Sequence, residues 1–222
     1  MEQRGKIIVV EGLIGAGKSS FCQELGSQLQ TAEVFLEPDE QTEIINPYLA
    51  KFYEDPERWA FTMQIHLMQS RYQTHLRAQQ MTKVLKVDAI IDRSIYGDTC
   101  FAKLQRDLGT MSEHEYRTYT SLYEALLSPN IQKPDLCVWL NVSVDTAYER
   151  VMSRMESREG RRCEESISKD YLFALDKQIQ STVKDLAKKG IEVIEIPWND
   201  NRPEPVDRLQ YIQQVADQAL YI

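Results

Sequence analysis

The feature that most constrains this chain is a glycine-rich turn between a short apolar run and a helical pattern. Residues 7–10 are β-branched and apolar, and Glu11 ends the run. From Lys18 onward apolar residues recur at helical spacing. These are Phe21, Cys22, Leu25 and Leu29. The turn between them, Gly12-x-x-x-x-Gly17-Lys18-Ser19, fits a phosphate-binding loop, which is informative only between a strand and a helix. We therefore predict a strand, a phosphate loop and a helix.

A loop of this kind binds phosphate for geometric reasons. Backbone N–H groups in a loop poor in side chains converge on phosphate oxygens, and the following helix presents its partly positive N-terminus. Lys18 is expected to reach the outer phosphates, and the Ser19 hydroxyl to bind Mg²⁺. The residues predicted to contact ATP here are Gly12, Leu13, Ile14, Gly15, Ala16, Gly17, Lys18, Ser19 and Ser20. The loop predicts binding of a nucleoside triphosphate but leaves the reaction open.

The composition limits the number of domains and the kinds of partner that the chain can have. A chain of 222 residues with 42% hydrophobic residues is long enough for one well-buried core and short for two, so we expect a single domain over residues 1–222. A net charge of -8 argues against a broad surface for nucleic acid or anionic membrane. No apolar run approaches the roughly eighteen residues of a membrane span. The cysteines show no Cys-x-x-Cys spacing and the N-terminus resembles no secretion signal, so a cytoplasmic location is expected.

Apolar runs and helical patterns alternate along the remainder of the chain. Further strands are predicted at residues 33–36, 87–91, 136–140 and 191–196. Further helices are predicted at residues 55–83, 97–106, 112–127, 143–157, 169–189 and 205–221. Such alternation favours an α/β fold with a five-stranded parallel sheet and helices on both faces.

Two acids follow predicted strands. In an open parallel sheet the carboxyl ends of the strands face the ligand crevice. Asp92 is the expected partner of Mg²⁺ in a phosphate-loop protein, directly or through a second shell, and Arg93 can pair with phosphate in a bidentate manner. Glu37 precedes Pro38 at the end of another strand. On the residues alone, Glu37 is better interpreted as a solvated loop acid.

Two stretches of polar residues admit both a functional and a structural interpretation. Gln64 and Arg71 are seven positions apart and share a helix face with Phe61, so they could read the edge of a nucleobase or simply be exposed. The stretch after residue 153 contains four arginines within nine positions. It can be interpreted as a solvated helix end or as a lid over a phosphoryl group. The arginines are Arg154, Arg158, Arg161 and Arg162. With a phosphate loop present, the lid is favoured.

These motifs together resemble the deoxynucleoside kinases of the deoxycytidine and deoxyguanosine kinase type. The matching pieces, in family order, are the phosphate loop, Leu36-Glu37-Pro38, Tyr53-x-x-Pro56-Glu-Arg-Trp59-x-Phe61-x-x-Gln64, Ser70-Arg71, Asp92-Arg93-Ser94-x-Tyr96-x-Asp98, and the arginine stretch ending in Glu164-Glu165. The resemblance implies a phosphate-loop kinase fold with an arginine-rich lid, and a homodimer.

The resemblance also implies roles for individual residues. Glu37 would be the general base that accepts the proton of the sugar 5′-hydroxyl. Lys18, Ser19 and Asp92 would hold triphosphate and Mg²⁺, and Arg93 would orient the 5′-oxygen and the phosphates.

The remaining implied roles concern the sugar, the base and the donor. Tyr53 and Glu165 would bind the sugar 3′-hydroxyl. Gln64, Arg71 and Asp98 would contact the base, with Phe61 stacking on it. Lid residues Arg154, Arg158 and Arg161 or Arg162 would neutralise charge during transfer; one extra residue in this stretch leaves the last choice open. The segment that contains Asn199 and Asp200 stands where the family holds the donor adenine.

The expected reaction is transfer of the γ-phosphoryl group of ATP, with Mg²⁺, to the 5′-hydroxyl of a deoxynucleoside. Arg71 together with Asp98 suggests a deoxypurine or deoxycytidine, with a lean towards purine. A thymidylate kinase or other nucleoside monophosphate kinase is the nearest alternative. A switch GTPase is a second, although the chain lacks both an Asn-Lys-x-Asp and an Asp-x-x-Gly motif.

Overall fold

A single parallel sheet organises the molecule. The computed structural model describes residues 4–29, 31–37, 46–127, 131–156, 166–199 and 205–221. The strands are β1 (Ile7–Gly12), β2 (Ala32–Phe35), β3 (Asp88–Asp92), β4 (Leu136–Asn141) and β5 (Glu192–Pro197). All neighbours pair in parallel, in the order β2-β3-β1-β4-β5. The predicted α/β fold with a five-stranded parallel sheet is confirmed.

Helices connect the strands. They are α1 (Lys18–Gln28), α2 (Leu49–Glu54), α3 (Pro56–Gln80), α4 (Ile95–Asp107), α5 (Glu113–Leu126), α6 (Val144–Glu156), α7 (Lys169–Lys188) and α8 (Pro205–Tyr221). A π-helical turn, η1 (Met81–Leu85), follows α3. Helix α2 was not predicted from the sequence, because six residues are too few to display a helical period.

The helix-start signals predicted from the sequence agree with the structure at two helices. At a third, the structure corrects the predicted start. The Asp55 side chain caps α3 by accepting from the backbone N–H of Arg58, and Ser112 with Glu115 forms the predicted capping box of α5. Helix α4 begins at Ile95, two residues earlier than predicted. The reason is Ser94, whose hydroxyl accepts from two backbone N–H groups of the first turn and so acts as the N-cap.

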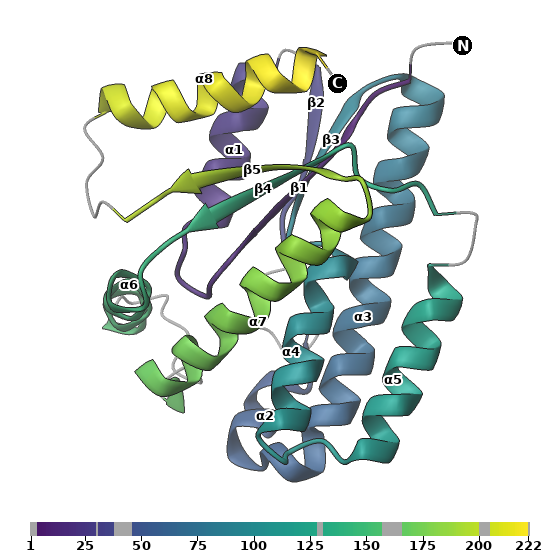
Figure 1. The fold of residues 1–222 in the computed structure, drawn as a ribbon, viewed down its shortest axis with the longest axis vertical. Helices are drawn as coiled ribbons and strands as arrows, with labels where there is room; N and C mark the ends of the chain where they lie inside the picture. Colours follow the sequence, from purple (N-terminus) through teal and green to yellow (C-terminus); the bar gives the residue numbers. More distant parts are fainter. Residues whose placement is uncertain are drawn as a thin grey trace.

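Both faces of the sheet are covered. Strand β1 is central, and its side chains point alternately to opposite faces. Ile8 and Val10 lie in the hydrophobic cluster that contains residues of α1 and α8, whereas Ile7 and Val9 lie in the cluster that contains residues of α3. Figure 1 shows α1 and α8 on one side of the sheet and α3 and α7 on the other. The buried central strand therefore holds the phosphate loop on a rigid base.

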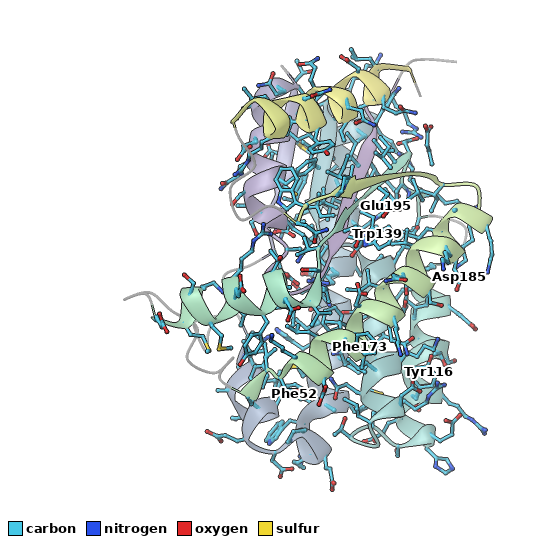
Figure 2. All side chains as sticks on the ribbon, turned by 60° about the vertical axis from the view of Figure 1, so that its left-hand side comes forward. Phe52, Tyr116, Trp139, Phe173, Asp185 and Glu195 are labelled. Carbon is cyan, nitrogen blue, oxygen red and sulfur yellow. The ribbon has the colours of Figure 1, made fainter. Side chains whose placement is uncertain are left out.

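The parallel arrangement brings the ends of distant segments together. The β4–β5 register pairs Trp139 with Glu195, and the two side chains lie beside each other in Figure 2. On the other side, β1 pairs with β3 so that Val10 is opposite Asp92. The phosphate loop after β1, the acid that ends β3 and Glu37 after β2 consequently meet at one edge of the sheet.

None of the helices in the described part of the chain is long and apolar enough to cross a lipid bilayer.

The capping box of α5 gives a test of the fold. Ser112→Ala removes the hydroxyl that accepts from the backbone N–H of Glu115, and should lower the free energy of unfolding by about 1 kcal/mol in urea denaturation. Ser121→Ala, an exposed position of the same helix, is the control. An equal loss in both variants would contradict the capping role.

Candidate active site

The phosphate loop has the expected conformation. Gly17, the N-cap of α1, has φ 85°, a left-handed conformation that side chains disfavour and glycine adopts readily. The loop turns back on itself, since the backbone N–H of Ala16 donates to the Leu13 carbonyl at 3.1 Å. Lys18 is buried, and its Nζ donates to the same carbonyl at 3.1 Å. The N-terminus of α1 and the Lys18 ammonium therefore face the space where a phosphate would sit.

Residues that are distant in the sequence support the phosphate loop. Arg150 of α6 donates from Nη1 to the Ala16 carbonyl at 3.1 Å and from Nη2 to the Trp198 carbonyl at 3.2 Å. The Trp198 ring packs edge-on against Phe21, with 5.5 Å between ring centroids. The sequence analysis did not single out Arg150, because nothing local indicates that its guanidinium reaches a loop 134 positions earlier.

The two predicted magnesium ligands lie together. The Ser19 hydroxyl donates to Asp92 Oδ2 at 2.5 Å, and the other carboxylate oxygen, Oδ1, is buried with no hydrogen-bond partner among the described residues. An anionic oxygen left unpaired in the interior is costly unless a cation or donor joins it. A hydroxyl and a carboxylate oxygen beside a phosphate loop are ligands that Mg²⁺ takes, so this pair fits the ion.

Arg93 lies between the phosphate loop and Glu37. Its Nη2 donates to the Gly12 carbonyl and its Nε to Glu37, both at 3.4 Å. The guanidinium carbon lies 4.7 Å from the centroid of the Phe101 ring. Burial opposes its charge, but Glu37 and Glu11 outweigh this and raise the pKa of Arg93. Arg93 is therefore a permanent cation at the point where donor and acceptor would meet.

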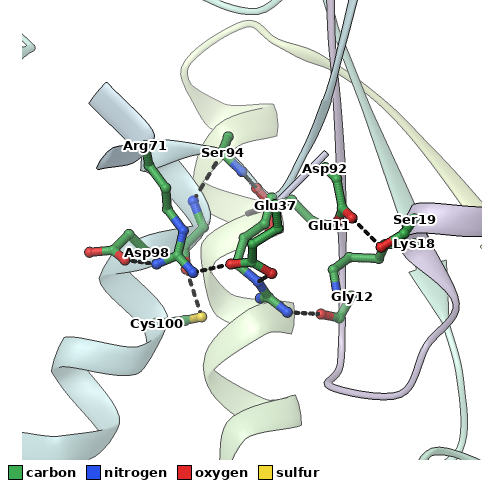
Figure 3. A network of polar contacts seen from close by, with 12 residues as sticks. Glu11, Gly12, Lys18, Ser19, Glu37, Arg71, Asp92, Ser94, Asp98 and Cys100 are labelled. Atoms are coloured by element: carbon green, nitrogen blue, oxygen red, sulfur yellow. Dashed lines mark hydrogen bonds and ion pairs between the residues drawn. The ribbon is translucent and has the colours of Figure 1, made fainter. Parts of the chain in front are cut away.

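Glu37 is bound by two arginines (Figure 3). Its Oε1 accepts from Arg71 and its Oε2 from Arg93. Burial acts to raise the pKa of Glu37, but the charges of Arg71, Arg93 and Lys18 outweigh it and hold the pKa well below its usual value. Glu37 is thus ionised and partly buried, which differs from the solvated loop acid that the residues alone favoured.

Gln64, Arg71 and Asp98 form the end of the site away from the phosphate loop. Arg71 also donates to Asp98 Oδ1, so its guanidinium joins two carboxylates. Gln64 is fully buried, and neither its Oε1 nor its Nε2 has a hydrogen-bond partner among the described residues. Because buried amides are normally paired, Gln64 is ready to pair with a ligand.

Most of these groups line one cavity of about 280 Å³, whereas Asp98 is fully buried, is absent from the lining and is joined to it through Arg71. Its lining includes Lys18, Ser19, Glu37, Tyr53, Gln64, Arg71, Asp92, Arg93 and Arg154, all singled out from the sequence. The lining also includes residues that the sequence analysis missed, which are Leu49, Phe52, Met63, Leu67, Phe101 and Tyr171. At helical spacing, these apolar and aromatic residues have no signal that separates them from core positions.

Some predicted residues lie elsewhere. Phe61 is absent from the lining of the cavity and packs against the hydrophobic cluster around α3, so Phe52 and Phe101 are the phenylalanines available for stacking. Asn199 accepts from the backbone N–H of Ser143. The positions of Arg158, Arg161, Arg162, Glu165 and Asp200 fall outside the described residues.

Comparison with known proteins gives the family. The model of the family described as deoxynucleoside kinase matches residues 8–218. A deoxyguanosine kinase of Dictyostelium discoideum is 36% identical over 195 residues, which cover 88% of this chain and 65% of that protein. The chain belongs to the deoxynucleoside kinase family. The predicted family is therefore confirmed, and with it the class of enzyme, which phosphorylates deoxynucleosides.

Other relatives of this kinase agree with that assignment. A deoxyadenosine/deoxycytidine kinase of Bacillus subtilis is 38% identical over 170 residues, covering 76% of this chain and 72% of that protein. Among solved structures, a deoxyadenosine kinase of M. mycoides with dCMP and dCDP bound superposes with a TM-score of 0.77 at 25% identity, covering 97% of this chain and all of the other. The predicted phosphate-loop kinase fold is confirmed.

The low pKa of Glu37 gives a test of the site of this kinase. Arg71→Gln removes the first of the three charges that lower the pKa of Glu37, so the pKa rises. Because a carboxylate accepts a proton only when ionised, the acid limb of the pH profile of kcat/KM should move to higher pH by about one unit or more. Arg106→Gln, an arginine of α4 that pairs with Asp107, is the control. Coincident acid limbs in wild type and Arg71→Gln would contradict this arrangement.

Proposed function

We propose that the protein transfers the γ-phosphoryl group of ATP to the 5′-hydroxyl of a deoxynucleoside bound in the 280 Å³ cavity. The observation that carries the proposal is Arg93, whose guanidinium contacts both the Gly12 carbonyl of the phosphate loop and the Glu37 carboxylate. Glu37, the proposed proton acceptor, and the phosphate loop therefore lie on either side of the Arg93 cation. An alcohol held by Glu37 would thus face the terminal phosphate of a donor in the loop.

The reaction needs one proton transfer and one displacement. Glu37 takes the proton of the 5′-hydroxyl, and the 5′-oxygen forms a bond to the γ-phosphorus as the bond to the bridging oxygen of ADP breaks. Lys18, Arg93 and Arg154 line the cavity and would balance the phosphoryl charge. Ser19 and Asp92 would hold Mg²⁺, which would supply further positive charge for the transfer. The protein contributes mainly alignment and a site from which water is excluded.

The opposite end of the cavity would hold the nucleobase. Gln64 offers a donor and an acceptor, Arg71 offers donors and Asp98 offers acceptors, which suits the edge of a base that carries an amine or a ring nitrogen. We propose a deoxypurine or deoxycytidine as the substrate, with a lean towards purine, and Tyr53 beside the sugar. Three of the relatives named above are kinases of deoxyguanosine, deoxyadenosine or deoxycytidine, which supports this choice.

Two further proposals concern the cellular location and the oligomeric state of the enzyme. A cytoplasmic location is supported by Cys22, Cys100 and Cys137, which are buried free thiols. A homodimer is carried over from the family resemblance, and exposed leucines on the two helices α3 and α5, Leu76 and Leu122, are apolar side chains that a partner could cover. Light scattering of the purified protein tests the dimer.

A substrate panel tests the acceptor. With ATP and Mg²⁺, the four natural deoxynucleosides and their 5′-monophosphates are compared as kcat/KM. We expect activity on deoxynucleosides to exceed activity on monophosphates, because Arg71, at the acceptor end of the cavity, already pairs with two carboxylates and leaves little positive charge for a phosphate on the acceptor. A preference for a monophosphate would favour the nucleoside monophosphate kinase alternative.

Replacement of Glu37, the proposed general base, tests the mechanism. Glu37→Gln keeps the shape of the side chain but cannot accept the proton, and should lower kcat by about a hundredfold or more. Binding of ATP, measured by calorimetry, should survive, because Glu37 lies outside the phosphate loop. A variant with near-normal kcat would remove Glu37 from the proposed role.

A further inference from the structure

Asp98 is joined to the cavity through Arg71, which lines it, and its carboxylate is also bound by a residue of α5, a helix that does not contribute to the lining. The Tyr119 hydroxyl donates to Asp98 Oδ2 at 2.5 Å, while Asp98 Oδ1 accepts from Arg71. Tyr119 and Asp98 are both 0% exposed. Tyr119 comes from the middle of α5, and Asp98 from the first turn of α4. Each oxygen of this carboxylate therefore has one fixed donor, from a different element.

This arrangement fixes how Asp98 meets a ligand. A carboxylate oxygen has about two lone-pair directions, so each oxygen of Asp98 keeps one after accepting its first hydrogen bond. With both oxygens anchored, the carboxylate cannot rotate about its last bond without losing a charge-assisted hydrogen bond. Burial raises the pKa of the Tyr119 hydroxyl well above its usual value, so this group stays protonated and remains a donor at neutral pH.

We propose that Tyr119 is a specificity-determining positioning residue, which selects the nucleobase by fixing the orientation of the Asp98 carboxylate that reads its edge. The inference rests on the proposed role of Asp98 in the base pocket. An oriented carboxylate is an acceptor, and it favours bases that present an exocyclic amine, adenine and cytosine, over bases that present a carbonyl at the same place, guanine and thymine. Loss of the Tyr119 hydroxyl leaves a buried anionic oxygen short of a donor and frees the carboxylate to turn towards Arg71.

The test is Tyr119→Phe, which removes one oxygen atom and keeps the ring in the core. We expect the ratio of kcat/KM for deoxyadenosine to that for deoxyguanosine to fall about tenfold, the order expected for one hydrogen bond to a charged group. The deoxycytidine to thymidine ratio should fall in the same direction. Tyr123→Phe is the matched control, since Tyr123 lies one turn further along α5 and its hydroxyl makes no hydrogen bond to Asp98 among the described residues. Its ratios should equal those of wild type.

A double-mutant cycle separates positioning from a general loss of stability. If Tyr119 acts through Asp98, adding Tyr119→Phe to Asp98→Ala should change the base ratios no further, whatever it does to the melting temperature. An equal change of the ratios with and without Asp98 would overturn the inference. So would wild-type ratios in Tyr119→Phe alongside altered ratios in Asp98→Ala, and in that case the proposed pocket would stand. Unaltered ratios in Asp98→Ala would overturn the pocket itself, and the role of Tyr119 with it.

Discussion

The site depends on the mutual compensation of charges that are removed from water. The charges of Arg71, Arg93 and Lys18 keep Glu37 anionic in spite of its burial, and Arg93 keeps its charge in the interior because carboxylates lie close to it. An isolated buried charge costs several kcal/mol, so removing one member would expose the next to the full penalty. The network in Figure 3 is therefore a single electrostatic unit, built at the one edge where three strands end.

This unit links the two ends of the substrate cavity. Arg93 connects the carboxylate of Glu37 to the phosphate loop, and Arg71 connects the same carboxylate to Asp98, at the end where we propose that the base binds. A nucleobase that competes for Arg71 would alter the charge next to Glu37. In the proposed mechanism, one guanidinium therefore joins recognition of the nucleobase to the charge of the proton acceptor Glu37, and a poorly fitting base would lower turnover as well as binding.

Local patterns predicted most of the fold, and part of the site. The strand, glycine turn and helix around Lys18 are specified within a few residues, and the parallel sheet follows from the alternation of strands and helices. The neighbouring residues gave no sign of a special role for Glu37, and its proposed role as the general base comes from the family resemblance. Arg150 and Tyr119 went unnoticed, because their contacts join positions 134 and 21 residues apart and depend on how helices dock. Sequence periodicity records which face a residue occupies but not which group lies opposite it.

The turn after β3 shows how such a long-range contact can set catalytic geometry. Arg93 has φ 63°, a left-handed conformation that costs a residue with a side chain about 1 kcal/mol or more and persists only where the surroundings determine it. Here Glu11, the residue before the phosphate loop, accepts from both the backbone N–H and the hydroxyl of Ser94 at 2.9 and 2.6 Å. A Cβ at Gly97 would lie 2.1 Å from this carboxylate, so only glycine leaves room for it. This contact adds to the β1–β3 pairing and to the hydrogen bond from the Arg93 backbone N–H to the Val10 carbonyl, and together they fix the turn that carries Arg93 against the strand that carries the phosphate loop.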